Sequence, residues 1–413
     1  MPDGDMGAVS TNLLLDRVQR ETLRYFTDFA HSACGMARER SGSGNMMDTV
    51  TTGGTGFGIM AMIAGAERGF LARSDLVQRV AAICRFLEAA PRHRGAFAHW
   101  MNGSSGATVA FSTRDDGGDI VETAFLMMGL ITARQYLQAS APALARRIDE
   151  LWRGVDWAGY CPEPNRFLWH WSETQGFGMA LQLRGWHEAL VAFVLGAGSP
   201  THPIDVRAYS EGWKDSPTFR NGQVYYRIRL PLGPPMGGPL FFAHYSFMGI
   251  DPRGLGEGGI DYWAQNRAQV RINRAHCIAN PHGFAGYGAD CWGLTASDGP
   301  HGYEAFSPGN DKGVIAPTAA LASMPYAPAA ALAALRRFDS YQGGALWGDF
   351  GFRDAFCAQE GWIATSHLAI NQGPIVAMIE NHRSGLLWRL FMSAPEVRLG
   401  LGRLGFTRGG VTA

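Results

Sequence analysis

The chain has 413 residues, of which 46% are hydrophobic and 17% are charged. Its 36 basic residues balance its 36 acidic residues, so the sequence offers no basic surface for nucleic acid. No apolar run approaches the ~20 residues that span a bilayer, and the N-terminus has no secretory pattern. We therefore expect a folded protein without nucleic-acid or membrane partners, located in the cytoplasm, or in the periplasm if a leader has been removed.

The cysteines and histidines form no metal-binding pattern. No Cys-x-x-Cys pair occurs, and no two histidines stand four apart on a predicted helix. We therefore expect no metal and no other cofactor. Because a chain of this size does not need disulfides, we also expect mostly buried free thiols at Cys34, Cys84, Cys161, Cys277, Cys291 and Cys357.

Most of the predicted elements are helices joined by short connections. The spacing of apolar residues predicts a first amphipathic helix over 13–29, after a disordered or tag-like segment at 1–12. A Gly- and Ser-rich loop is expected at 34–58, a small β-hairpin at 221–230 and a long functional loop at 283–312. Further helices are predicted at 57–67, 74–90, 120–136, 141–152, 185–195, 261–279, 317–324, 328–338, 367–380 and 386–392.

Buried and amphipathic helices alternate along the chain. The segments 120–131 and 185–195 are apolar on all sides, whereas 13–29 has one polar face. This alternation is typical of an inner ring of helices surrounded by an outer ring, and the lack of a fixed repeat period disfavours a solenoid. The sequence predicts a single all-α domain over 13–406, followed by a short tail at 407–413.

Four carboxylates gather where the most apolar helix begins. Asp115, Asp116, Asp119 and Glu122 flank a Gly-Gly pair, which lets the backbone turn tightly into the helix. Asp119 and Glu122 have the spacing of a capping box, and this alone is a structural explanation for both. A cap uses only two of the four acids, however, and surplus buried charge is costly. The cluster therefore indicates a cleft at this end of the helix.

Five sequence motifs, in this order, resemble one known family. The chain is similar over 13–406 to the glucoamylase-like domain of glycoside hydrolase family 144, and related sequences form part of bacterial cyclic β-1,2-glucan synthases. The motifs are Arg114-Asp-Asp-Gly-Gly-Asp-Ile-Val-Glu-Thr123, Gly185-Trp-His-Glu-Ala-Leu190 with Gly198-Ser-Pro-Thr-His-Pro203, Trp292-Gly-Leu-Thr-Ala-Ser-Asp298, Ala316-Pro-Thr-Ala-Ala320, and Gln372-Gly-Pro-Ile-Val376 with Met378-Ile-Glu-Asn381.

The resemblance implies an (α/α)6 barrel that hydrolyses linear or cyclic β-1,2-glucan to sophorooligosaccharides. It also implies that the matched acids Asp115, Asp119, Glu122 and Glu188 are catalytic, with Glu188 as the proton donor. Substrate contacts are expected from Arg40, His99, Trp100, Asp116, Trp186, His187, Trp292, Asp298, Tyr303, Trp347 and Asn371.

Three positions depart from the family pattern that the resemblance implies. We expect Asp at the position of Glu39, commonly Asn at that of His187, and often Asp at that of Asn371. The missing acid at Asn371 removes one candidate for the general base.

The chemistry of glycoside cleavage agrees with this assignment. Inverting enzymes hold their two carboxyl groups ~6.5–9.5 Å apart, and retaining enzymes ~5–5.5 Å apart. Asp119 and Glu122 are three positions apart on one helix, which leaves little room for a water and a sugar between them. We expect the helix N-terminus to keep both ionised, and Glu188 to face them from another helix.

We therefore predict an inverting hydrolase that acts as a monomer on β-1,2-glucan or its oligosaccharides. Two alternatives stay open at this point. One is an exo-acting enzyme that releases sophorose, and the other is a glucan-binding relative without catalytic activity.

Overall fold

The computed structural model of the protein describes residues 4–42, 44–409 and 411–412. An inner ring of apolar helices forms its centre. Buried residues surround most of these helices instead of following one face, because few polar side chains interrupt them. The inner helices are α2 (Thr52–Glu67), α4 (Ile120–Leu137), α6 (Leu190–Gly198), α7 (Phe241–His244), α9 (Pro317–Leu321) and α11 (Ala369–Arg383).

The inner helices close into a ring. Helix α2 packs against α4, α4 against α6, and α9 against α11, which returns to α2. Two hydrogen bonds bring α7 and the turn after it between α6 and α9. The Val191 N–H donates to the Ser246 hydroxyl at 2.9 Å, and a ring nitrogen of His244 lies 3.0 Å from the Ser323 hydroxyl.

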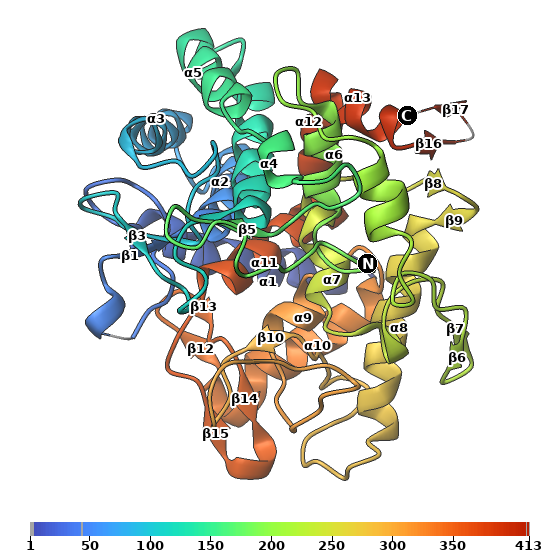
Figure 1. Cartoon of the computed structure of the whole chain (residues 1–413). Coiled ribbons are helices and arrows are strands. Elements are labelled where there is room, and N and C mark those ends of the chain that lie inside the picture. The colour runs from blue at the N-terminus through green and yellow to red at the C-terminus, as the bar shows by residue number, and fades with distance from the viewer. Residues whose placement is uncertain (1–3, 43, 410, 413) are drawn as a thin grey trace.

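A second set of helices covers this ring, as Figure 1 shows for α3 and α5 outside α2 and α4. The predicted barrel of inner and outer helices is therefore confirmed. Two short helices near the C-terminus, α12 (Leu386–Ser393) and α13 (Pro395–Arg403), complete the cover over α4 and α6. The other outer helices are α1 (Gly4–Thr27), α3 (Arg73–Ala89), α5 (Pro142–Arg153), α8 (Tyr262–Ala279) and α10 (Pro328–Ser340).

Glycines bring α2 and α4 into close contact. A Cβ on Gly56 would lie 2.1 Å from the Phe125 carbonyl oxygen, and one on Gly129 would lie 2.2 Å from the Gly56 carbonyl oxygen. The Gly-rich stretch that we expected to remain a loop up to residue 58 therefore enters a helix at Thr52. Its glycines serve helix–helix packing instead of loop flexibility.

The described residues near both ends of the chain form more secondary structure than the sequence predicts. Helix α1 begins at Gly4, so it includes 4–12 of the segment expected to be disordered, and 1–3 lie outside the described residues. The expected C-terminal tail forms β16 (Thr407–Arg408) and β17 (Val411–Thr412). These strands extend a sheet with β8 (Leu255–Glu257) and β9 (Ile260–Asp261).

Two loop regions matter for the sites described below. Helix α6 begins at Leu190 instead of 185, so Glu188 lies in the turn before the helix and not in its first turn. The predicted hairpin is present as β6 (Val224–Tyr225) and β7 (Ile228–Arg229). It lies beside α8 in Figure 1.

The remaining strands are two or three residues long and form one three-stranded sheet and several two-stranded sheets in the loops around the barrel. All six cysteines are free thiols, and only Cys161 is partly exposed. Among the residues that the structure describes, each helix is too short or too polar to cross a bilayer. The short strands are β1 (Thr49–Thr51), β2 (Trp100–Asn102), β3 (Thr108–Val109), β4 (Gly118–Asp119), β5 (His170–Trp171), β10 (Ala296–Ser297), β11 (Glu304–Ala305), β12 (Trp347–Gly348), β13 (Gly351–Phe352), β14 (Phe356–Cys357) and β15 (Trp362–Ile363).

Candidate active site

A pocket of about 330 Å³ opens at the N-terminal ends of the inner helices. Thr51 and Leu368 line it directly before α2 and α11, Glu122 lines it from the first turn of α4, and Glu188 lines it just before α6. Helix N-termini carry partial positive charge, so this end of the barrel favours carboxylates. The other lining residues are Glu39, Arg40, His99, Trp100, Phe111, Phe125, Trp169, Phe241, Tyr245, Ala296, Tyr303 and Ile370.

His99 lies among three of the four carboxylates at the start of α4. Its Nδ1 is 3.2 Å from Asp119 and 3.6 Å from Asp115, and its Nε2 is 3.9 Å from Glu122. The ring stacks on Phe111, with centroids 4.2 Å apart. Burial by itself lowers the pKa of His99, but the three carboxylates raise that pKa well above its ordinary value. His99 is therefore a protonated imidazolium that partly neutralises the acids.

Asp119 is the N-cap of α4. Its Oδ1 accepts the N–H groups of Val121 and Glu122, both at 2.9 Å, and its Oδ2 accepts the Trp169 indole N–H at 2.9 Å. The side chain is only 1% exposed, so Asp119 holds its neighbours in place and does not line the pocket. The capping part of the predicted box is therefore confirmed. Glu122 does not complete the box, because its carboxylate binds elsewhere.

Glu122 is the carboxylate of this cluster that reaches the pocket. Its Oε2 accepts the Gly53 N–H at 2.8 Å, and a Cβ on Gly53 would lie 2.4 Å from that oxygen. Burial raises the pKa of Glu122 to about 7, although His99 lowers it. The helix end therefore does not keep Glu122 fully ionised at neutral pH, because burial disfavours its charged form. A carboxyl group that titrates near neutrality is suited to proton transfer.

Glu188 reaches the same pocket from the turn before α6. Its backbone carbonyl accepts a hydrogen bond from the Ser246 hydroxyl, and its carboxylate lies 3.5 Å from Nδ1 of His187. The His187 ring stacks on Trp169, with centroids 5.7 Å apart. Glu122 and Glu188 therefore line one cavity from different elements, which is the arrangement that glycoside cleavage requires.

Asp115 and Asp116 lie beside the pocket and are not part of its lining. Asp115 is 5% exposed, with one oxygen facing His99 and the other 3.7 Å from His170. Asp116 is directed toward the hydroxyl of Thr174, which donates a hydrogen bond to it. Asp115 therefore contacts a pocket residue, His99, without lining the pocket itself. Among the described residues, Asp116 contacts none that lines the pocket.

Arg40 joins two loops at the edge of the pocket. Its guanidinium donates to Glu39 at 2.7 Å and to both oxygens of Asp298 at 2.9 and 3.2 Å. The Ser366 hydroxyl also donates to Asp298, at 2.5 Å. Arg40 and Tyr303 line the pocket as predicted, whereas Asp298 acts on the pocket through Arg40.

Asn371 is buried behind the pocket, beside a carboxylate that the sequence did not reveal. Its amide donates to Asp354 at 2.8 Å and to the Ala296 carbonyl at 3.0 Å. Asp354 also accepts the Asp298 N–H at 2.7 Å. Burial, followed by the charge of Asp298, raises the pKa of Asp354 to about 7. The family pattern often has Asp at position 371, and here the nearby carboxylate is instead that of Asp354, which accepts a hydrogen bond from Asn371.

Only one of the four tryptophans predicted to bind substrate lines the pocket, and it is Trp100. Trp186 is 2% exposed and stacks on Trp213 in the core, and Trp292 is fully buried. Trp347 lies under the Arg17 guanidinium and is absent from the pocket lining. The predictions for Trp186 and Trp292 are therefore wrong, because large aromatic side chains often fill a core. The prediction for Trp347, which is partly exposed, stays a prediction.

Several pocket residues were missed from the sequence. The position of Trp169 depends on the pairing of β4 with β5, which the sequence does not reveal. Phe241 begins α7, a four-residue helix too short for a periodic pattern. Glu39 is adjacent to the predicted Arg40, and this adjacency was the available signal. Phe111, Phe125 and Tyr245 complete the missed aromatic lining.

The cluster around His99 also has the composition of a cation site. One ligand atom from each of His99, Asp115 and Asp119 lies within 4.8 Å of the others. A protonated His99 supplies the positive charge that these carboxylates require, so the geometry is satisfied by the chain itself.

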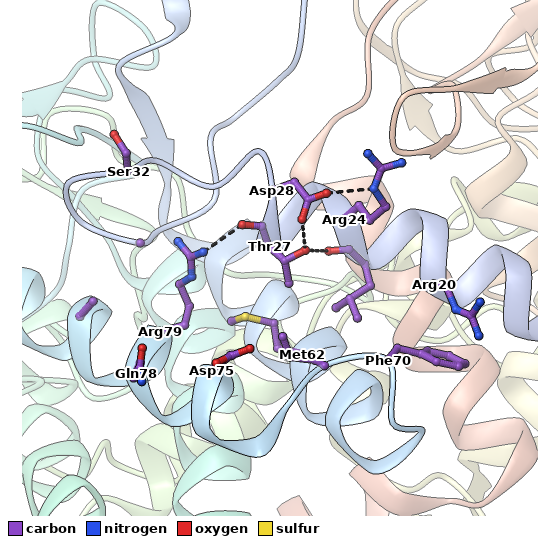
Figure 2. A pocket seen from close by; sticks show the side chains of 14 residues that line it. Arg20, Arg24, Thr27, Asp28, Ser32, Met62, Phe70, Asp75, Gln78 and Arg79 are labelled. Atoms are coloured by element: carbon purple, nitrogen blue, oxygen red, sulfur yellow. Dashed lines mark hydrogen bonds and ion pairs between the residues drawn. The ribbon is translucent and has the colours of Figure 1, made fainter.

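A larger cavity of about 640 Å³ lies on another face, between α1, α2 and α3. Figure 2 shows Arg24 bonded to Asp28 and Arg79 donating to the Thr27 carbonyl in this cavity. Its two lining carboxylates, Asp28 and Asp75, are both exposed, and Asp28 is paired with Arg24, whereas Glu122 is buried in the other pocket. The pocket at the inner helix N-termini is therefore the candidate active site.

Comparison with known proteins gives a consistent result. Residues 180–395 match a family model described as "Putative glucoamylase". A crystal structure from Bacteroides uniformis, described in the same words, is 50% identical, with a TM-score of 0.95, and covers 97% of this chain and 98% of that one. The chain is also similar to an endo-β-1,2-glucanase from Chitinophaga pinensis, at 43% identity and a TM-score of 0.94 over 97% of this chain and 99% of that chain.

A curated relative from Parabacteroides distasonis is named exo β-1,2-glucooligosaccharide sophorohydrolase (non-reducing end). It is 41% identical over 95% of this chain. The chain spans 57% of the length of that relative.

Proposed function

The chain belongs to the glucoamylase-like family, and we propose that it is a glycoside hydrolase that cleaves β-1,2-glucan or β-1,2-glucooligosaccharides. The observation that carries this proposal is the convergence of Glu122 and Glu188 in one cavity lined by aromatic rings. The names of its relatives from Chitinophaga pinensis and Parabacteroides distasonis supply the class of substrate. Aromatic side chains offer flat apolar faces on which sugar rings stack.

Glu188 acts as the proton donor to the leaving oxygen in this proposal. It is the pocket carboxylate outside the α4 cluster that adjoins a histidine, and His187 at 3.5 Å offers a route for returning the proton. Glu122 acts as the base that activates water. A base with a pKa of about 7 is ionised in part at neutral pH and is stronger than an ordinary carboxylate.

His99, Asp115 and Asp119 support Glu122 in this scheme. The imidazolium of His99 lies between Glu122 on one side and the two aspartates on the other. As Glu122 gains a proton from the attacking water, the remaining charges hold its side chain and the His99 ring in place. We assign these three residues to positioning, because neither of the two aspartates lines the pocket and His99 acts through Glu122.

We further propose that the reaction inverts the anomeric configuration. In this proposal Glu122 and Glu188 stand far enough apart for a water to enter between them, whereas a covalent intermediate requires a second carboxylate directly below the anomeric carbon. Proton NMR of fresh digests, read before mutarotation, should show the α-anomer first. Initial accumulation of the β-anomer would contradict the roles given to Glu122 and Glu188.

The mode of cleavage is tested by the product profile. Linear and cyclic β-1,2-glucans should be cleaved, whereas β-1,3-, β-1,4- and α-glucans should not. Sophorose as the sole early product would indicate exo action, as named for the Parabacteroides distasonis relative, and a range of sophorooligosaccharides would indicate endo action, as named for the Chitinophaga pinensis relative. Binding of β-1,2-glucan without any product would instead support a non-catalytic relative.

A further inference from the structure

A second histidine–carboxylate cluster lies outside the pocket, where the C-terminal end of α8 meets the loop between β11 and α9. The Nε2 atom of His276 is 2.8 Å from Oδ2 of Asp311, and both side chains are only 1% exposed. His276 lies in the last turn of α8, and Asp311 follows β11 along the chain. None of the residues in this cluster lines the candidate active site.

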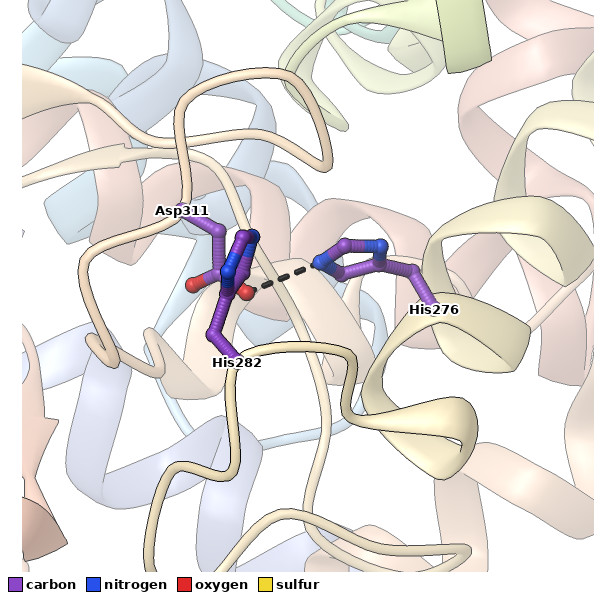
Figure 3. Close-up of side chains that lie close together, drawn as sticks. All are labelled: His276, His282 and Asp311. Atoms are coloured by element: carbon purple, nitrogen blue, oxygen red, sulfur yellow. Dashed lines mark hydrogen bonds and ion pairs between the residues drawn. The ribbon is translucent and has the colours of Figure 1, made fainter.

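His282 approaches this pair from the loop after α8. Asn280 ends the helix in a left-handed conformation (φ 45°), and its side chain bonds the backbone of Phe284 in both directions. The chain therefore turns back on itself, and the His282 ring lies 6.2 Å from the His276 ring. Ligand atoms of His276, His282 and Asp311 all lie within 4.8 Å of one another. Figure 3 shows His282 beside the Asp311 carboxylate, with His276 across from both.

Outer hydrogen bonds orient the two buried members of the cluster. The Tyr226 hydroxyl lies 2.9 Å from Nδ1 of His276. The Tyr287 hydroxyl donates to Oδ1 of Asp311 at 2.6 Å, and the Gly313 N–H donates to the same oxygen at 3.0 Å. The atoms that remain to face each other and His282 are Nε2 of His276 and Oδ2 of Asp311. Histidines and carboxylates that bind metals are characteristically held in this way by their second polar atom.

We propose that His276, His282 and Asp311 form a binding site for a divalent transition-metal ion of the Zn²⁺ class. Two imidazoles and one carboxylate suit Zn²⁺, whereas Ca²⁺ and Mg²⁺ prefer a set of oxygen ligands. Three protein ligands leave a fourth position for water, and the exposed His282 gives an ion access from solvent. In the absence of an ion, a proton on His276 satisfies the contact with Asp311.

The position of the site gives the ion a structural role. The site joins the end of α8, the β6–β7 hairpin through Tyr226, and the long loop that carries Tyr303 to the pocket. An ion that binds only the folded protein stabilises it by mass action. Removal of the metal should therefore lower the melting temperature clearly and change kcat little.

The test uses the full chain after treatment with EDTA, titrated with ZnCl₂ by calorimetry and compared with CaCl₂ and MgCl₂. The wild type should bind one Zn²⁺ ion and neither Ca²⁺ nor Mg²⁺. His282→Ala should weaken Zn²⁺ binding by at least ~10-fold, the lower range for loss of even an outer partner of a metal site. Because His282 is exposed, this variant should fold. His202→Ala, which removes an exposed histidine elsewhere, is the matched control and should bind Zn²⁺ like the wild type.

A second measurement locates the ion. Anomalous diffraction at the zinc edge should give a peak between His276 and Asp311, and Zn²⁺ should raise the melting temperature of the wild type but not of His282→Ala. Equal Zn²⁺ affinity in the wild type and His282→Ala would overturn the proposal. So would Zn²⁺ binding that is lost in His99→Gln and retained in His282→Ala, because it would place the ion in the pocket.

Discussion

The two sides of the pocket differ in how they hold their carboxylates. At the start of α4, three acids surround His99, and only Glu122 among them lines the cavity. At the start of α6, Glu188 is a single carboxylate, with His187 3.5 Å away. The first side is a buried network in which each charge depends on the others. The second side is one group that can be removed without leaving other charges unpaired.

This difference indicates a division of roles. A network of buried charges holds its members in fixed positions but makes the pKa of each sensitive to its neighbours. A single carboxylate beside the leaving group needs no such support to deliver a proton. Substitutions on the α6 side should therefore reduce the rate with little effect on folding, whereas substitutions on the α4 side should change rate, pH dependence and stability together.

The largest expected effect follows from Glu188→Gln. Loss of the proton donor should reduce kcat by on the order of 10²–10⁴-fold, because the amide keeps the shape of the side chain but has no proton to give. Substrate affinity and the melting temperature should change little. Steady-state kinetics on β-1,2-glucan and a melting curve measure both. Glu211→Gln, an exposed substitution outside the pocket, is the control, and activity within a few-fold of wild type in Glu188→Gln would remove Glu188 from the mechanism.

Glu122→Gln should have the next largest effect. We expect kcat to fall by roughly 10²-fold or more, because the amide cannot accept a proton from water. The same substitution leaves His99 without one of its carboxylates, so stability should change as well. Unfolding in urea, measured beside the kinetics, separates the two effects. If Glu122→Gln were less stable but turned over normally once folded, Glu122 would be only a structural member of the α4 cluster.

His99→Gln should move the pH profile as well as lower the rate. His99 lowers the pKa of Glu122, so its loss should raise that pKa further and shift the acidic limb of kcat/KM to higher pH. Phe111→Leu removes the ring that stacks on His99 but leaves its charge, and this control should keep the limb in place. A uniform loss of activity with an unmoved limb would show that His99 has a packing role alone.

Much of the barrel could be predicted from the sequence because its signals are local. The apolar segments that form α4 and α6 are recognisable by composition alone. The start of α2 was missed because Gly56 is typical of a loop in the sequence, and only the close approach of α4 explains it. The C-terminal strands were missed because two-residue strands have no periodicity.

The site was predicted in part for the same reason. Glu122 and Glu188 stand out as acids beside apolar helices, and both line the pocket. Trp169 and Asp354 could not be found, because each depends on a contact between distant segments: β4 with β5 for Trp169, and Asn371 with the 354 loop for Asp354. The raised pKa of Glu122 was not predicted, because its burial depends on tertiary packing.

The smallest expected effect concerns stability alone and involves Asp354, behind the pocket. Its pKa is raised from an ordinary value of 3.8 to about 7, so the folded protein holds a proton that the unfolded chain releases between about pH 4 and 7. The contribution of this proton to stability is present below pH 4 and is lost as pH rises through 7. Since a tenfold change in proton affinity corresponds to about 1.4 kcal/mol, the loss is on the order of a few kcal/mol.

Asp354→Asn stays neutral at every pH, so its unfolding free energy should change less between pH 5 and 7.5 than that of the wild type. Urea unfolding followed by tryptophan fluorescence at several pH values measures this slope. Asp215→Asn, at an exposed carboxylate, is the control and should keep the slope of the wild type. Equal slopes in Asp354→Asn and the wild type would show that Asp354 is ionised in the folded protein. Arg40 would then compensate for the charge of Asp354, although its guanidinium also binds Glu39 and Asp298.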